Sequence, residues 1–326
     1  MRWLAAALLL LCSVAAHADE LRPGFVELRQ RDAAHWSLSW KQPLVTPGEP
    51  ELVVPLFPPT CRIEGEPHQR LAALALVGSA ELMCEGPIAG QRAGYREILG
   101  GGDVLMRIAP LGQRVQSYRL TPAEPAVTLA TRADTLQVVR TYGTLGVSHI
   151  LTGWDHLLFV IALVLLVRRG WAVARAVTAF TVAHSLTLIG TTLGLVGLPQ
   201  APVEALIALS IVFLAAELLR ANDGTGGPSV TLRYPWAIAF AFGLVHGFGF
   251  AGALREIGLP EGEVPAALLS FNLGVEAGQL AVVLTVLAVL WLVAKLARQA
   301  LAPAVRLAAY AIGVTASYWL IDRVVA

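Results

Sequence analysis

The chain has 326 residues, of which 56% are hydrophobic and only 14% are charged, and its formal net charge at pH 7 is +1. Soluble domains contain about 25% charged residues, so this composition favours membrane-spanning segments over a single water-soluble core. The sequence has no basic run of the kind that binds nucleic acid, so we predict no nucleic-acid partner.

The first residues have the pattern of a secretory signal peptide. Arg2 supplies a positive charge, residues 4–14 form an apolar run, and residues 16–18 (Ala-His-Ala) form an A-x-A cleavage site. We therefore predict a signal peptide over residues 1–18, with Asp19 as the new N-terminus. An uncleaved signal anchor is the alternative.

Two cysteines, Cys61 and Cys84, fall in the segment that would be exported. Cysteine pairs persist as disulfides in oxidising compartments, and we predict that these two are bonded to each other. A metal-binding or redox pair is the alternative, although no neighbouring ligand pattern accompanies the two cysteines.

The segment over residues 19–135 is mixed in composition, rich in proline and without an apolar run long enough to cross a membrane. Short stretches of alternating apolar and polar residues, separated by Gly and Pro turn signals, predict β-strands. We predict a small periplasmic β-sandwich without chemistry of its own. The strand candidates are residues 25–30, 36–40, 51–57, 71–77 and 103–108.

The segment over residues 136–326 has the pattern of a transmembrane helical bundle. A helix needs about 20 predominantly apolar residues to cross the hydrocarbon core. Six segments meet this requirement, so we predict a membrane all-α bundle of six helices. They cover about residues 144–167, 172–195, 202–220, 234–254, 264–294 and 304–321.

The charges between these segments predict how the chain lies in the membrane. If the N-terminal domain is periplasmic, the connections predicted to be cytoplasmic hold Arg168, Arg169, Arg175, Arg220, Arg233, Lys295, Arg298 and Arg306. The periplasmic connections hold only Arg255, beside Glu256, Glu261 and Glu263, and Arg323 lies in the tail. This asymmetry follows the positive-inside rule. We predict a multi-pass protein of the bacterial inner membrane, with its N-terminal domain and its C-terminus in the periplasm.

Four of the seven histidines lie in the membrane region: His149, His156, His184 and His246. A charged group at the centre of a membrane helix costs about 2.5–3.5 kcal/mol on insertion scales, so such residues need partners or a polar cavity. His149 and His156 are seven residues apart, two helical turns, and would share one face of the first helix. We expect His149 near the periplasmic end and His156 about two turns deeper.

Two carboxylates accompany these histidines. Asp155 lies beside His156 in sequence and is either a ligand or a group that bonds to a histidine ring nitrogen. Glu276 shares a face of the fifth segment with Asn272 and Gln279. Imidazole and carboxylate together suit Ni(II), Co(II) or Zn(II) rather than Cu(I), which prefers sulfur. We predict a metal site made of His149, Asp155, His156, His184, His246 and Glu276.

These residues carry a resemblance to a known family. Residues 149–156 (His-Ile-Leu-Thr-Gly-Trp-Asp-His) resemble the H-x(3)-G-x-D-H signature of the HupE/UreJ family. Residues 180–185, 242–250 and 271–279 are also similar to that family, in the branch with a long exported N-terminal region. The resemblance covers about residues 135–295. Shorter members usually have a proline where this chain has Ile150.

HupE/UreJ proteins are regarded as nickel permeases that serve hydrogenase or urease maturation. The resemblance implies a secondary transporter of the nickel type, with ligands at His149, Asp155 and His156. The metal would be its substrate, with nickel first and cobalt or zinc next. A periplasmic protein or metallochaperone is a candidate partner, beside the lipid bilayer itself.

Two other functions stay open from the sequence. The same histidines and carboxylates could hold zinc and an activated water in a membrane-embedded hydrolase. Alternatively, the bundle could only anchor an interaction domain that recruits a partner through its β-strands. The sequence has no Walker A motif, so ATP hydrolysis by this chain is not predicted. We favour the transporter over either alternative.

Overall fold

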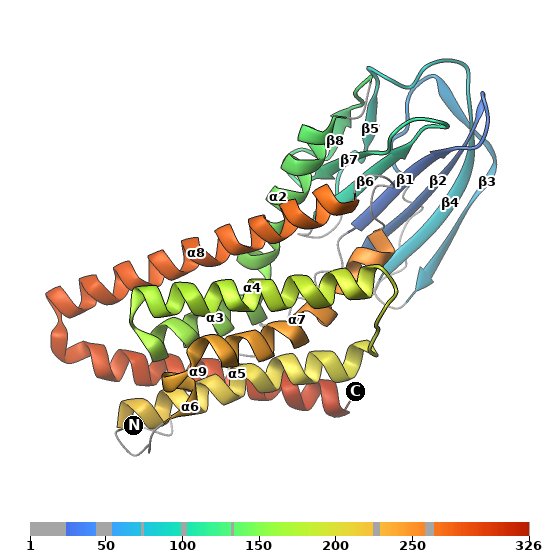
Figure 1. The fold of residues 1–326 in the computed structure, drawn as a ribbon. Helices are drawn as coiled ribbons and strands as arrows, with labels where there is room; N and C mark the ends of the chain where they lie inside the picture. The colour runs from blue at the N-terminus through green and yellow to red at the C-terminus, as the bar shows by residue number, and fades with distance from the viewer. Residues whose placement is uncertain are drawn as a thin grey trace. The chain divides into compact units, whose positions relative to one another are not determined.

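The computed structural model describes residues 24–43, 54–72, 75–98, 103–131, 134–223, 229–257 and 264–325. Within these ranges the chain forms two compact units (Figure 1). One is built from residues 21–145 together with 253–270, and the other from 146–252 together with 271–326. The predicted signal peptide over residues 1–18 lies outside the described residues.

The N-terminal unit is built on a six-stranded sheet with the strand order β3-β4-β2-β1-β6-β7. A separate two-stranded sheet is formed by β5 and β8, so the strands divide unequally rather than into two comparable layers. Neighbouring strands are antiparallel, except that β1 and β6 run parallel. The predicted β-rich N-terminal domain is thus confirmed. The strands are β1 (Gly24–Gln30), β2 (His35–Pro43), β3 (Cys61–Ala72), β4 (Ala75–Cys84), β5 (Arg92–Gly94), β6 (Val104–Ala109), β7 (Gln116–Leu120) and β8 (Ala126–Thr128).

Three of the predicted strands are confirmed: residues 25–30, 36–40 and 103–108 lie in or beside β1, β2 and β6. In β1, Val26 and Leu28 are fully buried, whereas Arg29 is exposed to solvent. The single strand predicted at 71–77 is wrong, because its described residues belong to two antiparallel strands: β3 ends at Ala72, β4 begins at Ala75, and Leu71 pairs with Leu76. This run of Leu, Ala and Val contains no Gly, Pro, Asn or Asp, so no turn signal marked the hairpin. Of the strand predicted at 51–57, the described part forms only an isolated bridge from Leu56 to Gly94.

The predicted disulfide between Cys61 and Cys84 is confirmed. Cys61 begins β3 and Cys84 ends β4, and the two residues are directly opposite each other in the antiparallel register. Both lie in the buried core of the sheet domain.

The helices of the structure are α2 (Thr135–Thr152), α3 (Trp154–Val167), α4 (Gly170–Thr192), α5 (Gln200–Asp223), α6 (Val230–Arg233), α7 (Pro235–Ile257), α8 (Val264–Leu296) and α9 (Arg298–Val325). Four of them, α4, α5, α8 and α9, are long and apolar enough to cross a membrane. The count rises to five if α2 and α3 together form one span. The prediction of six spans is therefore wrong for the described residues.

The difference in count lies in α7, which occupies the segment predicted at 234–254. α7 runs over 23 residues, Pro235–Ile257, but the apolar stretch within its fully described part is Pro235–Phe250. A second difference is that the helix predicted at 144–167 is broken. α2 and α3 meet at Gly153 with a bend of 71°.

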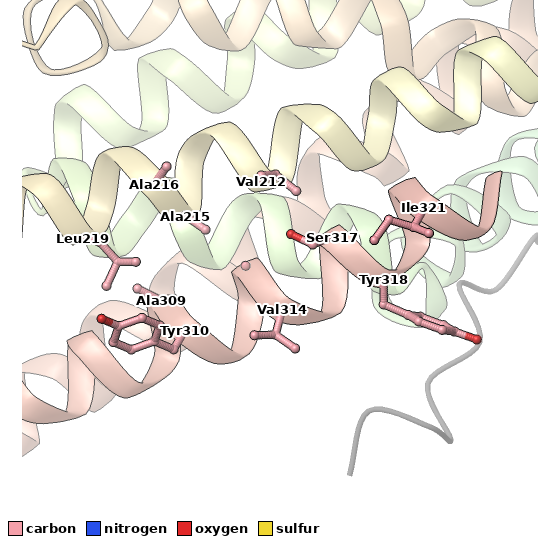
Figure 2. Close-up of a pocket in the computed structure, with 11 residues that line it drawn as sticks. Val212, Ala215, Ala216, Leu219, Ala309, Tyr310, Val314, Ser317, Tyr318 and Ile321 are labelled. Carbon is pink, nitrogen blue, oxygen red and sulfur yellow. The ribbon is translucent and has the colours of Figure 1, made fainter. Parts of the chain in front are cut away.

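Buried side chains of α3, α4, α5 and α9 form the core of the helical unit. α5 and α9 lie side by side and leave an apolar hollow of about 530 Å³ between them (Figure 2). Its lining consists of side chains such as Val212, Ala215 and Val314, with Tyr310 and Tyr318 along α9. Among the described residues that line this hollow there is no Asp, Glu, Lys, Arg or His.

The disulfide generates a prediction about the sheet domain. Cys61 and Cys84 are 23 residues apart, and closing a loop of that length stabilises a domain by about 3 kcal/mol. We expect the full-length double variant Cys61→Ala/Cys84→Ala to lose about that much free energy of unfolding in the sheet domain, measured by pulse proteolysis across a urea series. Reduced wild type should behave like the variant. Equal urea midpoints for oxidised wild type and the variant would contradict the prediction.

Candidate metal centre

The break between α2 and α3 brings two histidines together. In a continuous helix, residues seven apart are displaced by about 10 Å along the axis. The rings of His149 and His156 instead have centroids only 4.6 Å apart, because Gly153 leaves the helical conformation (φ −75°, ψ 98°) and α3 starts in a new direction. The expected separation of two helical turns between these rings is therefore wrong.

Gly153 permits this bend by its lack of a side chain. Its backbone angles are open to any residue, so the requirement is one of space. A Cβ atom at Gly153 would lie 2.7 Å from the carbonyl oxygen of His149 and 3.2 Å from both Asp155 Oδ1 and His156 Nδ1. Any larger residue would therefore push into the groups that the break brings together.

Two further histidines complete the cluster from α4 and α7. The ring of His184 has its centroid 6.3 Å from that of His149 and 6.1 Å from that of His156. The ring of His246 lies 5.3 Å from that of His156. All four histidines are buried, with between 0% and 6% of their surface exposed. The structure thus gathers all four histidines that the sequence placed in the membrane region.

Close packing of α4 and α7 positions the second pair. A Cβ atom at Gly243 would collide with the carbonyl oxygen of Phe180, and one at Gly247 would collide with the carbonyl oxygen of His184. The two helices therefore approach backbone to backbone, as small residues allow in membrane bundles. Because His246 lies between these glycines in the sequence, its ring is held beside α4.

Hydrogen bonds fix the orientation of two of the rings. His246 Nδ1 lies 2.9 Å from the carbonyl oxygen of Phe242, which can only accept, so Nδ1 carries the proton. His156 Nδ1 lies 2.9 Å from Asp155 Oδ1, and an ionised carboxylate likewise requires Nδ1 to donate. In both rings the lone pair is then on Nε2. A partner that fixes one ring nitrogen and leaves the other bare is the usual arrangement for a metal-binding histidine.

Six ring nitrogens of the cluster are buried without a hydrogen-bond partner among the described residues: both nitrogens of His149, both of His184, and Nε2 of His156 and His246. Buried polar atoms nearly always have a partner, so a group of six without one calls for an explanation. As placed, the described His, Cys, Asp and Glu side chains include no group of three or more that could hold a metal ion. The rings are near one another, but their nitrogens do not converge on one point.

Glu276, predicted as a ligand, has a different recorded partner. Thr178 of α4 donates a hydrogen bond of 2.6 Å to Glu276 Oε1, and Thr181 donates one of 2.8 Å to Gln279 Oε1. The predicted polar face of α8 therefore meets α4. No recorded contact between described residues joins Glu276 to a histidine ring.

An aromatic shell around the histidines was not predicted as part of the site. Phe250 and Phe271 lie with ring centroids 4.2 and 5.6 Å from His149, and Phe180 lies 5.0 Å from His246. Phe159 lies 5.3 Å from His246. One member of this shell could have been predicted from helical spacing: Phe180 precedes His184 by four residues and so lies on the same face of the helix.

Comparison with known proteins identifies one family. The family described as HupE / UreJ protein matches residues 126–323, which include every helix of the cluster. No curated protein matches the chain.

Gly153 provides a test of this geometry. We expect Gly153→Ala to destabilise the protein by about 1–3 kcal/mol, because the added methyl group overpacks the junction of α2 and α3. The measurement is the thermal unfolding midpoint of the purified protein in detergent. Gly170→Ala is the matched control, since a Cβ atom there meets only Leu287 Cδ1 at an ordinary 3.7 Å. If both variants unfold at the same temperature, Gly153 is not under the steric constraint described here.

Proposed function

Because the chain belongs to the HupE/UreJ family, we propose that it is a secondary transporter, a permease, that carries a divalent transition-metal ion, with nickel as the preferred substrate. The observation that carries the proposal is the cluster of four buried imidazole rings with six unpartnered nitrogens. We assign the role of substrate ligands to His149, His156, His184 and His246. Asp155 orients His156, as its hydrogen bond to Nδ1 indicates.

The spacing of the rings supports this assignment. Two imidazole nitrogens that each lie about 2.0–2.1 Å from one metal ion in a tetrahedral arrangement have ring centroids about 5 Å apart. The recorded centroid separations in the cluster run from 4.6 to 6.3 Å. The distances between the rings therefore suit ligation of one shared ion. The ring nitrogens, however, do not point toward a common centre, as they would around a bound ion. Rotation about the two side-chain torsions of each histidine would turn the free nitrogens toward a common ion.

The chemistry of the cluster supports a borderline divalent ion as the substrate. Imidazole suits nickel, cobalt and zinc, whereas Cu(I) prefers thiolate and thioether ligands. The sequence contains no cysteine after Cys84 and no methionine after Met106, so the helical region has no sulfur ligand to offer. Ligation requires unprotonated imidazole, so protons compete with the metal and uptake should weaken as the pH falls.

The charges at the helix ends support an orientation with the sheet domain in the periplasm of a bacterial inner membrane. Within the helical unit, the α3–α4 turn, α6 and the α8–α9 turn lie at one end (Figure 1). These parts and the adjoining ends of the helices carry Arg168, Arg169, Arg175, Arg220, Arg233, Lys295 and Arg298, whereas the residues between α4 and α5 carry no charge. The positive-inside rule assigns the arginine-rich end to the cytoplasm. The disulfide of the sheet domain agrees with an oxidising compartment for that domain.

The transport proposal is tested by metal accumulation in cells. We expect cells that express the wild type to accumulate nickel above the level of cells with an empty vector, and His156→Ala and His184→Ala to abolish the excess. His68→Ala is the matched control, because His68 lies on β3 of the sheet domain. Nickel, cobalt, zinc, copper and iron are measured together at equal membrane levels of each protein. No excess of any metal in the wild type would contradict transport.

A second substitution separates the role of Glu276 from that of the histidines. We expect Glu276→Gln to retain more accumulation than His156→Ala, because an amide oxygen can still accept the hydrogen bond from Thr178. Glu276→Ala should lose more than Glu276→Gln in the same assay. A loss in Glu276→Gln as complete as that in His156→Ala would show that the carboxylate charge itself is needed, and would return Glu276 to the ligand set.

A further inference from the structure

Three arginines line one cavity at the arginine-rich end of the helical unit. The cavity has a volume of about 650 Å³ and lies between two segments that are distant in sequence, residues 167–175 and residues 232–236. Arg169 and Arg175 face it from the start of α4, and Arg233 faces it from the end of α6. The fold therefore concentrates three permanent positive charges around one space.

These three arginines have no carboxylate partner among the described residues. Other arginines of the helical unit do: Arg220 pairs with Glu217 at 3.5 Å, and Arg323 pairs with Glu204 at 3.0 Å. The recorded interaction of Arg233 is with the ring of Tyr234, at 5.2 Å from the guanidinium carbon to the ring centroid. Guanidinium groups stay charged at all physiological pH values, so an anion is the species that would relieve their mutual repulsion.

The helix ends at the cavity add to the positive potential. α4 begins directly after Arg169, which makes no side-chain cap, and α7 begins at Pro235, a residue of the cavity wall. Both helices are 23 residues long. Unpaired N–H groups at the start of a helix attract anions. α4 carries this contribution, because Pro235 of α7 has no N–H and the N–H of Ala237 donates to the carbonyl oxygen of Tyr234.

Aromatic and apolar side chains in the same wall indicate what kind of anion fits. Tyr234 and Trp236 line the cavity beside Leu232, and all three are 44–47% exposed. Trp171, next to this segment on α4, is 77% exposed. Exposed Trp and Tyr at the ends of membrane helices are typical of the interface between hydrocarbon and headgroups. A ligand of this cavity would therefore sit at the depth of lipid phosphates.

We propose that this cavity is a binding site for the phosphate of an acidic phospholipid. The guanidinium groups of Arg169, Arg175 and Arg233 hold the phosphate oxygens, and Trp236 and Leu232 contact the glycerol and upper acyl region. Basic pockets between membrane helices on the cytoplasmic side favour anionic headgroups for these reasons. The proposal does not depend on the metal ion or on transport.

Native mass spectrometry of the purified full-length protein tests the site. Phosphatidylglycerol and phosphatidylcholine are titrated separately, and the first bound lipid is quantified for the wild type and each variant. We expect phosphatidylglycerol to bind more tightly than phosphatidylcholine, and each of Arg169→Gln, Arg175→Gln and Arg233→Gln to weaken its binding about fivefold. The matched control is Arg298→Gln, at the same end of the unit but outside the cavity wall.

Two controls keep the outcome interpretable. The corresponding lysine variants keep the charge and should keep most of the preference for phosphatidylglycerol, and the unfolding midpoint of each glutamine variant should match the wild type. An equal loss in Arg298→Gln would show diffuse surface attraction and overturn the site. A competition experiment with inorganic phosphate distinguishes a lipid from a soluble anion. If inorganic phosphate displaces phosphatidylglycerol and stabilises the detergent-solubilised protein by itself, the ligand is a soluble anion and the lipid proposal is wrong.

Discussion

A helix can break inside a bilayer only where the backbone groups that it frees find partners within the protein. At the junction of α2 and α3, the helical bonding of α2 runs as far as Gly153, and Asp155 supplies a partner at the start of α3. The N–H of Gly153 donates to the carbonyl oxygen of His149 at 3.0 Å, and the N–H of His156 donates to Asp155 Oδ1 at 2.8 Å. Asp155 thus accepts a hydrogen bond from a backbone N–H at the start of α3 and another from the ring of His156. The same carboxylate therefore stabilises the break and orients a ring of the cluster.

The unpartnered nitrogens of the cluster lower the stability of the fold. A buried polar atom without a partner costs about 1–3 kcal/mol, and six such atoms lie within four rings. Phenylalanine rings lie next to two of these histidines, Phe250 beside His149 and Phe180 beside His246. Local violations of this kind are expected at functional sites, and the surrounding close packing of α4 against α7 maintains them.

The sequence predicted the composition of the site better than its shape. Histidine is rare inside apolar helices, so His149, His156, His184 and His246 stood out without any structural knowledge. The break at Gly153 could not be predicted, because a single glycine within an apolar run is common in membrane helices and the bend depends on space beside His149. Helical spacing gave the correct polar face of α8, but spacing within one helix cannot name the partner helix. For Glu276 that partner is Thr178, whereas the predicted ligand role followed from its carboxylate and its place on that face.

α4 connects the two sets of polar contacts in the bundle. Its inner face carries His184, fully buried in the cluster, while Thr178 and Thr181 on adjacent turns bind Glu276 and Gln279 of α8. Residues six apart on a helix point about 120° away from each other, so Thr178 and His184 face different neighbours of the same helix. Any shift of α4 along its axis therefore changes the ring positions and the α8 hydrogen bonds together. Under the transport proposal, opening the cluster toward one side of the membrane would rearrange both, so the proposal assigns the α4–α8 contacts a role even though they contain no histidine.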